Sequence, residues 1–178
     1  MGSMVRFERW GWAGLLVVMI TTFGCDRVTK HLASVALSGA PAQSYLADTV
    51  RLEYAENTGA FLSLGATLPE SVRKTVLASA TSLVLIGTIF MAIKLRWSAA
   101  PLFGLALIFS GGASNLSDRL LHGHVIDFLN VGLGPLRTGI FNFADMAIML
   151  GVVVMVRTTG RAGETPAGEA APPETSST

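Results

Sequence analysis

The sequence predicts a mainly α-helical integral membrane protein with four transmembrane helices, and two observations support this. Of its 178 residues, 51% are hydrophobic and only 14% are charged, whereas soluble domains average about 25% charged residues. Four apolar stretches also recur, and each can approach the about 20 residues that cross a bilayer core of roughly 30 Å as a helix. They are residues 11–25, which can continue as a helix to residue 37, and residues 75–93, 99–117 and 139–156.

The charge and cysteine content exclude several classes of protein. The net charge of +1 gives no indication of nucleic-acid binding, and the single Cys25 rules out an internal disulfide framework. No Cys/His cluster has the spacing of a zinc site. His122 and His124 lie near Asp118 and Asp127, which leaves a metal as the lesser alternative to polar interface residues. We therefore expect no metal and no cofactor.

Basic residues predict the orientation of the four spans. Three basic groups fall at alternate ends of the spans and belong on the cytoplasmic side: Arg6 with Arg9, Lys94 with Arg96, and Arg157 with Arg161. Both termini would then be cytoplasmic, and the segments between spans one and two and between spans three and four would lie outside. The bias is modest, because further basic residues occur in the outer segments.

The first outer segment, residues 43–64, is too polar to span a membrane. Residues 50–54 alternate apolar and polar side chains, which predicts a short strand, and residues 57–59 supply a turn. Two or three such strands would form a platform on the membrane surface. We expect one membrane domain over residues 4–158, with its β-rich insertion at about 41–68. Residues 159–178 resemble a disordered tail, and residues 1–3 resemble a leftover of cloning.

The N-terminus permits a competing interpretation. Arg6 and Arg9, the apolar stretch and the sequence Thr-Phe-Gly before Cys25 resemble a bacterial lipoprotein signal peptide, whose cysteine would be lipidated. Cleavage there would remove the first span and leave an odd number of spans, which disagrees with the distribution of basic residues.

Polar residues recur at helical spacing toward the outer end of each span that carries them. Asp26 and Lys30 are four residues apart, and Asn142 and Asp145 are three apart. A third stripe lies in the third apolar stretch: Gly111, Asn115, and either Asp118 or Arg119. Because these groups share one depth, we expect them to enclose one site at the outer membrane face.

Asp127 and Asp145 lie in apolar surroundings without an adjacent basic residue. An ionisable group in a membrane costs roughly 2.5–3.5 kcal/mol on insertion scales and is by default a functional-site hypothesis. If the two aspartates face each other, repulsion between like charges keeps one protonated, and such a pair can hydrolyse a peptide bond by acid–base catalysis.

Structural roles are the simpler interpretation of the other polar residues. Asp26 with Lys30, and Asp118 with Arg119, are expected to form ion pairs, because a neighbouring cation removes a carboxylate from proton exchange. The amides can satisfy interhelical hydrogen bonds: Asn57, Asn115 and Asn142. Gly111 with Gly112 is expected to mark a close helix contact, since no Lys-Ser/Thr pair follows as in a phosphate loop.

Five ordered motifs resemble those of the bacterial lipoprotein signal peptidases, also called signal peptidase II. They lie at residues 26–30 (DRVTK), 57–61 (NTGAF), 110–119 (SGGASNLSDR), 125–128 (VIDF) and 141–145 (FNFAD). The resemblance extends from about Arg9 to Val156. Two positions depart from the family pattern, because Ser110 and Ser114 stand where glycines are usual. A serine adds little bulk, so the helix contact should survive.

The resemblance implies an aspartic endopeptidase of the bacterial inner membrane that cleaves the signal peptide of prolipoproteins just before a diacylglyceryl-modified cysteine. Asp127 and Asp145 would be the catalytic dyad. Positions that would bind substrate or support the site are Asp26, Lys30, Asn57, Gly59, Gly111, Asn115, Asp118, Arg119 and Asn142. The family fold adds a small periplasmic β-sheet and a surface helix between the first two spans. Family members are targets of the cyclic peptide globomycin, and a monomer would suffice.

Two other classes of function remain as alternatives. A proton-coupled transporter would also place carboxylates in membrane helices, but it would more often show internal repeats and polar residues near the midplane. A non-catalytic scaffold, such as a degenerate peptidase, would tolerate the loss of either aspartate. Neither repeats nor such a loss is present in the sequence.

Overall fold

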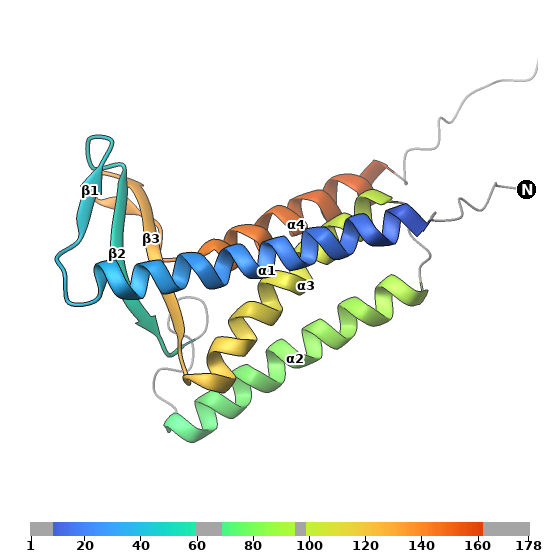
Figure 1. Ribbon diagram of the computed structural model, residues 1–178, viewed down its shortest axis with the longest axis horizontal. Coiled ribbons are helices and arrows are strands. Elements are labelled where there is room, and N and C mark those ends of the chain that lie inside the picture. Colours follow the sequence, from blue (N-terminus) through green and yellow to red (C-terminus); the bar gives the residue numbers. More distant parts are fainter. Residues whose placement is uncertain (1–8, 60–68, 95–98, 162–178) are drawn as a thin grey trace, which may run out of the picture.

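The computed structural model describes residues 9–59, 69–94 and 99–161, which form four helices and four strands (Figure 1). The helices are α1 (Arg9–Leu37), α2 (Glu70–Lys94), α3 (Ala99–Leu121) and α4 (Phe143–Arg161). The strands are β1 (Gln43–Tyr45), β2 (Val50–Asn57), β3 (Val125–Leu133) and β4 (Leu136–Arg137). Among the described residues, three helical stretches are long and apolar enough to cross a membrane: Gly11–Leu37, Glu70–Ile93 and Ala99–Leu121.

Helix α3 is the centre of the helical part and contacts α1, α2 and α4. Its buried side includes Gly104, where an added Cβ would lie 2.9 Å from the backbone oxygen of Gly151 in α4, so only glycine permits this close approach. The outward faces of α1 and α2 are apolar: Ile20 is 63% and Leu83 is 69% exposed. Large exposed apolar surfaces mark contact with lipid or with another protein, and here they extend along whole helices.

The strands form one antiparallel sheet in the order β1-β2-β3-β4. The register pairs Asn57 of β2 with Val125 of β3, and an irregularity between Leu52 and Ala55 interrupts this ladder. Figure 1 shows the sheet across one end of α1, α3 and α4. The sheet therefore brings side chains from two distant segments of the chain to the ends of these helices.

The predicted helices and the strand at residues 50–54 are confirmed, the first helix continuing to Leu37 as expected. Two features of the local structure were not predicted. Half of the sheet comes from residues 125–137, for which no strand was predicted. Helix α4 begins at Phe143 rather than near residue 139, because Asn142 caps it and is not part of it.

Other expectations fall outside the described residues. The surface helix between α1 and α2 has no counterpart in residues 38–59, and residues 60–68 are not described. Residues 1–3 and most of the expected tail also lie outside the described part of the chain. These expectations therefore stay predictions.

Candidate active site

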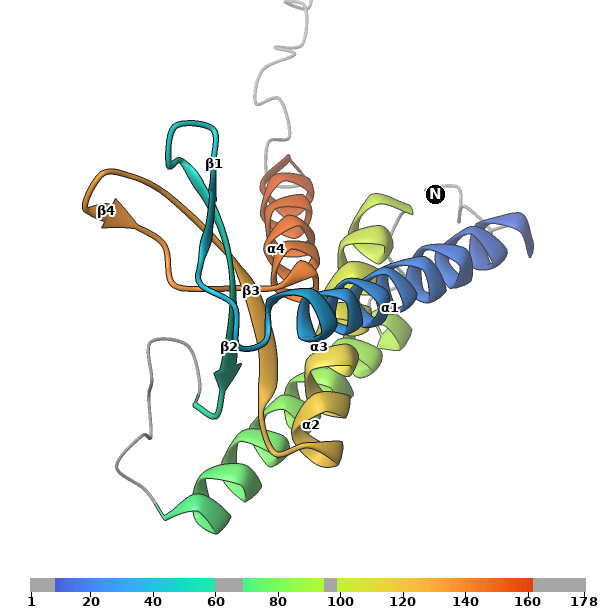
Figure 2. The ribbon, with the colours of Figure 1, turned by 60° about the vertical axis from the view of Figure 1, so that its left-hand side comes forward.

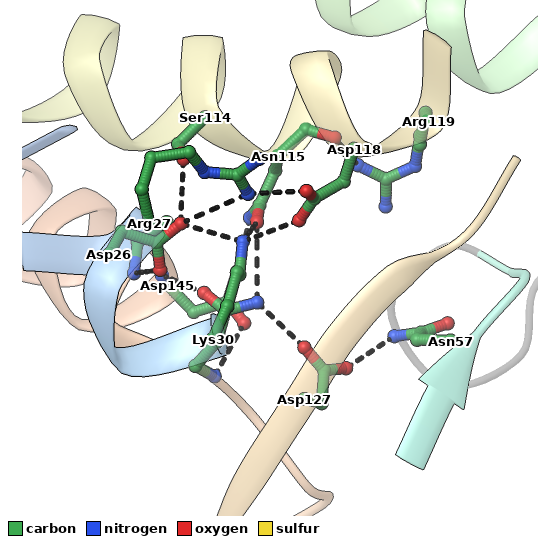
Figure 3. Close-up of polar contacts among 12 residues, drawn as sticks. Asp26, Arg27, Lys30, Asn57, Ser114, Asn115, Asp118, Arg119, Asp127 and Asp145 are labelled. Atoms are coloured by element: carbon green, nitrogen blue, oxygen red, sulfur yellow. Dashed lines mark hydrogen bonds and ion pairs between the residues drawn. The ribbon is translucent and has the colours of Figure 1, made fainter. Parts of the chain in front are cut away.

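Asp127 lies on β3 and is almost completely buried, at 3% exposure. Two asparagine side chains donate to its carboxylate. Asn57 Nδ2, from the neighbouring strand β2, lies 2.9 Å from Oδ2, and Asn142 Nδ2 lies 2.6 Å from Oδ1 (Figure 3). The sheet register places Asp127 opposite Ala55, two residues before Asn57. Pairing of β2 with β3 therefore positions the first of these donors.

Asp145 lies in the first turn of α4 and takes part in a reciprocal cap with Asn142. The amide of Asp145 donates to Asn142 Oδ1 at 3.0 Å, and the amide of Asn142 donates to Asp145 Oδ2 at 3.2 Å. This is the capping-box arrangement, here with asparagine and aspartate. The other carboxylate oxygen, Oδ1, accepts from Asn115 Nδ2 of α3 at 2.8 Å. The local sequence of the helix start thus fixes the orientation of this acid.

Asn142 connects the two aspartates. Its side-chain Nδ2 donates to the carboxylate of Asp127, and its Oδ1 accepts from the backbone amide of Asp145. The same Nδ2 lies 3.2 Å from Asn115 Oδ1. Because the backbone amide of Asn142 also donates to Asp145 Oδ2, this one residue contacts the carboxylates of two acids from different elements. The expectation that both aspartates belong to one site is consistent with this geometry.

Both acids open onto a groove of about 940 Å³. Its walls come from β2, α3, α4 and the segment between β4 and α4, and include Asn57, Gly59, Asn115, Arg119, Ile140 and Met149. Such a volume suits a ligand-sized molecule or an extended peptide segment. The two carboxylates are therefore buried within the fold but reachable from one cleft, whose lining combines apolar side chains with polar and charged ones.

Burial raises the pKa of Asp127 from its ordinary value of 3.8 to about 6. The hydrogen bond from Asn57 opposes this shift because it favours the ionised form, whereas the negative charge of Asp145 adds to it. The hydrogen bond from Asn142 also lowers the pKa. Asp127 can therefore exchange a proton close to neutral pH, as an acid–base group must.

A buried ion cluster lies beside the acid pair. Lys30, only 2% exposed, has its Nζ 2.7 Å from Asp26 Oδ2 and 2.8 Å from Asp118 Oδ2. The same Nζ donates to Asn115 Oδ1 at 2.8 Å. Arg27 pairs with Asp118 from the other side. Two carboxylates and two cations are thus balanced, which is the condition for burying such groups.

Asp26 also holds the start of α4. Its Oδ1 accepts from the backbone amide of Ala144 at 2.9 Å, one of the helix-start amides that no residue of α4 can satisfy. The charge of Asp26 is favourable there because it faces the positive end of the helix dipole. The ion cluster and the acid pair are therefore coupled through the position of α4.

The predicted pairing of Asp26 with Lys30 is confirmed, but the predicted pair of Asp118 with Arg119 is wrong. Residues 118 and 119 leave α3 in different directions, so Asp118 points to Lys30 and Arg27. Among the residues that the structure describes, Arg119 makes long contacts, at 3.4 Å to the backbone oxygen of Asn115 and 3.5 Å to that of Gly59. Sequence reasoning did not select Arg27, although its place beside Asp26 in the first motif offered that signal.

Gly111 supports the site by close packing. A Cβ there would lie 2.5 Å from the backbone oxygen of Ala144 and 2.9 Å from Ile148 Cγ1. We expect Gly111→Ala to lower the stability by about 1–3 kcal/mol because α3 and α4 must separate. Thermal unfolding in detergent would measure this. Gly24→Ala is the matched control, since nothing lies within 4 Å of its added Cβ; equal losses in both variants would contradict the packing argument.

Ser114 has a more specific role than the expected small increase in bulk. It is fully buried, and its Oγ donates to Asp26 Oδ2 at 2.6 Å. Ser110 instead donates to the backbone oxygen of Ala106 within its own helix. We expect Ser114→Ala to lower the stability by about 1–2 kcal/mol, since a charged acceptor loses a donor, and Ser110→Ala to change it by less than about half as much. Thermal unfolding of both variants tests this, and a larger loss for Ser110→Ala would refute it.

Comparison with known proteins agrees with this architecture. The family model described as signal peptidase (SPase) II matches residues 18–159. A lipoprotein signal peptidase of Sphingopyxis alaskensis is 34% identical over 143 residues, which cover 79% of this chain and 82% of the relative. One of Borreliella burgdorferi is 30% identical over 148 residues, covering 80% of this chain and 86% of the relative.

Two solved structures share the fold, and both are described as a bacterial membrane enzyme determined by the in meso method. One has a TM-score of 0.73 at 20% identity and covers 89% of this chain and 95% of its own. The other has a TM-score of 0.71 at 22% identity and covers 83% of this chain and 92% of its own. At these identities the likeness concerns the fold.

Proposed function

The chain belongs to the signal peptidase II family, and on that premise we propose that it is an aspartic endopeptidase with Asp127 and Asp145 as its catalytic dyad. Membership confirms the resemblance that the five motifs indicated, and it makes the protein a membrane peptidase. The observation that supports the dyad proposal is that both acids line one groove and that Asn142 donates to both carboxylates, through its side chain to Asp127 and through its backbone amide to Asp145.

The proposed substrate is a prolipoprotein whose cysteine already carries diacylglycerol, cut just before that cysteine. The lipid chains would stay in the bilayer while the signal peptide enters beside the helices. Apolar residues of the groove, among them Ile140 and Met149, would face this region of the substrate. Globomycin-type cyclic peptides would occupy the same groove.

The proposed reaction is hydrolysis without a covalent enzyme intermediate. One ionised aspartate takes a proton from a water molecule held between the pair, and the other, protonated, polarises the scissile carbonyl and later protonates the leaving amine. The raised pKa of Asp127 supports this role. The pair titrates as a unit, so the resting proton belongs to both acids. Asn57, Asn115 and Asn142 would hold the carboxylates in place through the hydrogen bonds described above.

We propose α4 as the fourth membrane span, which puts both termini in the cytoplasm and the sheet on the periplasmic face of the inner membrane. Arg157 near the end of α4 would then lie on the cytoplasmic side. Residues 4–158 would form one peptidase domain that acts as a monomer. Its outer insertion at about 41–68 contributes β1 and β2, and β3 and β4 complete the sheet. This places the water-requiring dyad at the membrane surface.

Cleavage of a purified prolipoprotein tests the proposed function. The protein in detergent or lipid should cut the diacylglyceryl-modified precursor, and mass spectrometry should find the product beginning at the modified cysteine. The same precursor without the lipid is the matched control and should be cut far more slowly. Absence of cleavage of the modified precursor by the folded protein would refute the proposal.

The pH dependence gives a sharper test of the role of Asp127. Because the pair needs one proton, we expect kcat/KM to fall as the pH rises through about 6, the pKa to which burial raises Asp127. The hydrogen bond from Asn57 lowers this pKa by favouring the carboxylate. Asn57→Ala should therefore raise it and move the alkaline limb of the profile to higher pH, as measured by initial rates across the pH range.

Glu56→Gln is the control for this shift. Glu56 also lines the groove but has no hydrogen bond to Asp127 in the described structure, so the alkaline limb should stay in place. A limb that moves to lower pH in Asn57→Ala would show that this hydrogen bond does not stabilise the ionised acid.

A further inference from the structure

The segment between β4 and α4, residues 138–141, runs antiparallel to β3 but does not match it residue for residue. At one end, the amide of Thr138 donates to the backbone oxygen of Val131 at 2.8 Å. At the other end, Phe141 and Leu129 exchange two backbone hydrogen bonds, each of 2.9 Å. Between these two contacts the segment has two residues and β3 has only one. This extra residue makes the segment a β-bulge.

The bulge leaves backbone groups without partners. Its residues are Gly139 and Ile140, which stand opposite the single Asn130 of β3. Among the residues that the structure describes, no hydrogen bond uses the backbone amide or carbonyl of Gly139 or of Ile140. A bulge interrupts the ladder in this way because its extra residue has no counterpart on the neighbouring strand. Two donors and two acceptors of the main chain are therefore available to another peptide.

Side chains on β3 and β4 hold the bulge in place. Asn130 is buried, at 6% exposure, and its Nδ2 donates to the backbone oxygen of Thr138 at 2.6 Å. Thr138 Oγ1 accepts from the amide of Val131 at 3.0 Å, and Arg137 donates to Asn130 Oδ1. The backbone beside the bulge is thus fixed by the protein itself, and a site formed in advance loses less conformational entropy on binding.

The bulge lies in the wall of the groove that holds the two acids. Besides Asp127 and Asp145, the groove is lined by both residues of the bulge. In Figure 2 the segment that contains the bulge crosses from the sheet to the start of α4. A Cβ added at Gly139 would meet nothing within 4 Å, so the backbone there is open to approach. A peptide within reach of the acids would therefore lie beside the unpaired backbone groups.

We propose that the substrate segment around the scissile bond binds in an extended conformation and pairs with Gly139 and Ile140 as an added strand. Main-chain hydrogen bonds of this kind supply affinity, whereas pockets for the side chains supply specificity. A helical segment cannot pair in this way, because its N–H groups bond within the helix. The signal peptide is therefore unwound at the cleavage site. This inference deepens the proposed function and rests on it.

An ester scan of the substrate tests the pairing without changing the enzyme. In synthetic diacylglyceryl-modified precursors, each non-scissile peptide N–H near the cleavage site would be replaced in turn by an ester oxygen, which removes a donor without adding bulk. Along a strand, alternate residues bond to the same neighbour. We expect kcat/KM to fall about three- to tenfold, the effect of one hydrogen bond, at one position or at two positions two residues apart. Adjacent positions should change less than about twofold.

Two variants of Ile140 assign this effect to the bulge. Ile140→Pro removes the amide donor at a bulge, where proline is tolerated, and Ile140→Ala shortens the side chain but keeps the amide. An ester carbonyl is a weaker acceptor than an amide carbonyl, so its penalty depends on the donor that it faces. The penalty should persist in Ile140→Ala and shrink below about twofold in Ile140→Pro, as in a double-mutant cycle for groups in contact.

The outcomes separate this inference from the proposed function. A flat ester profile, with the all-amide precursor cut at its normal rate, would overturn the pairing and leave the proposed function standing. Losses that recur every three to four residues would indicate a helical substrate and would also overturn it. So would a penalty that is unchanged in folded Ile140→Pro. If that variant does not fold, the profile of the wild type decides. If the all-amide precursor is not cut, the proposed function fails and the pairing fails with it.

Discussion

Replacing Asp127 by asparagine is expected to lower kcat/KM for the lipid-modified precursor by about 10²–10⁴-fold, the usual contribution of a positioned acid–base group. Asparagine keeps the shape of the side chain but cannot exchange the proton. The same loss is expected for Asp145→Asn, and the double variant should lose little more than either one, because the two acids act as a unit. Initial cleavage rates of the purified variants measure these losses.

The stability of Asp127→Asn separates a catalytic role from a structural one. Because the pKa of Asp127 in the folded protein is about 6, above its ordinary 3.8, the native state binds the proton more tightly than the unfolded state. Stability is therefore lost as the pH rises from about 4 to about 6, and above that pH the loss stays constant. A neutral amide avoids that cost but offers one acceptor oxygen fewer to Asn57 and Asn142. We expect an unfolding temperature within about 4 °C of the wild type at neutral pH.

Glu70→Gln is the matched control for the loss of an acid. Glu70 is an exposed carboxylate in the first turn of α2 and pairs with Lys74, so cleavage should be unchanged. Full activity in either aspartate variant, or a loss explained entirely by unfolding, would remove the dyad from the mechanism.

Lys30→Met is expected to give the largest loss of stability. Methionine has nearly the length of the lysine but leaves Asp26 and Asp118 buried together without their shared cation. Breaking a buried ion pair in this way costs roughly 3–5 kcal/mol, which corresponds to a fall of roughly 10 °C or more in unfolding temperature. Cleavage should fall too, because Asn115 loses the ammonium group that orients it toward Asp145.

Two further variants control this prediction. Lys74→Met removes an exposed lysine paired with Glu70 and should cost less than about 1 kcal/mol. Adding Asp118→Asn to Lys30→Met removes the charge left without a partner, so part of the lost stability should return. If the double variant is less stable than Lys30→Met alone, uncompensated charge is not the cause. Thermal unfolding in the same detergent compares all of these proteins.

The helices and the choice of aspartates could be predicted from local features of the sequence. Apolar runs indicate membrane helices without knowledge of the packing, and Asp127 and Asp145 are recognisable because carboxylates are costly in such surroundings. The i,i+4 spacing of Asp26 and Lys30 also sufficed to predict their ion pair, which is confirmed.

The partners of most polar groups could not be predicted, because they come from distant parts of the chain. Asp118 pairs with Lys30 and Arg27 of α1 rather than with its neighbour Arg119, since adjacent residues on a helix point in different directions. Strand β3 was missed because its short mixed sequence has no clear period of two, and only pairing with β2 establishes it. The role of Ser114 depends on the approach of α1 to α3.

By itself, the sequence determined that this is a mainly helical membrane protein of the signal peptidase II family, and it determined which two acids are candidates for catalysis. Periodicity, composition and motifs are local properties of the chain, so they can be recognised from the sequence without a three-dimensional structure. Only the tertiary structure decided that Asn142 bridges the two aspartates, that Asp26 holds the start of α4, and that burial raises the pKa of Asp127. These are properties of contacts between distant segments, because a side chain's environment is set by what the fold packs against it.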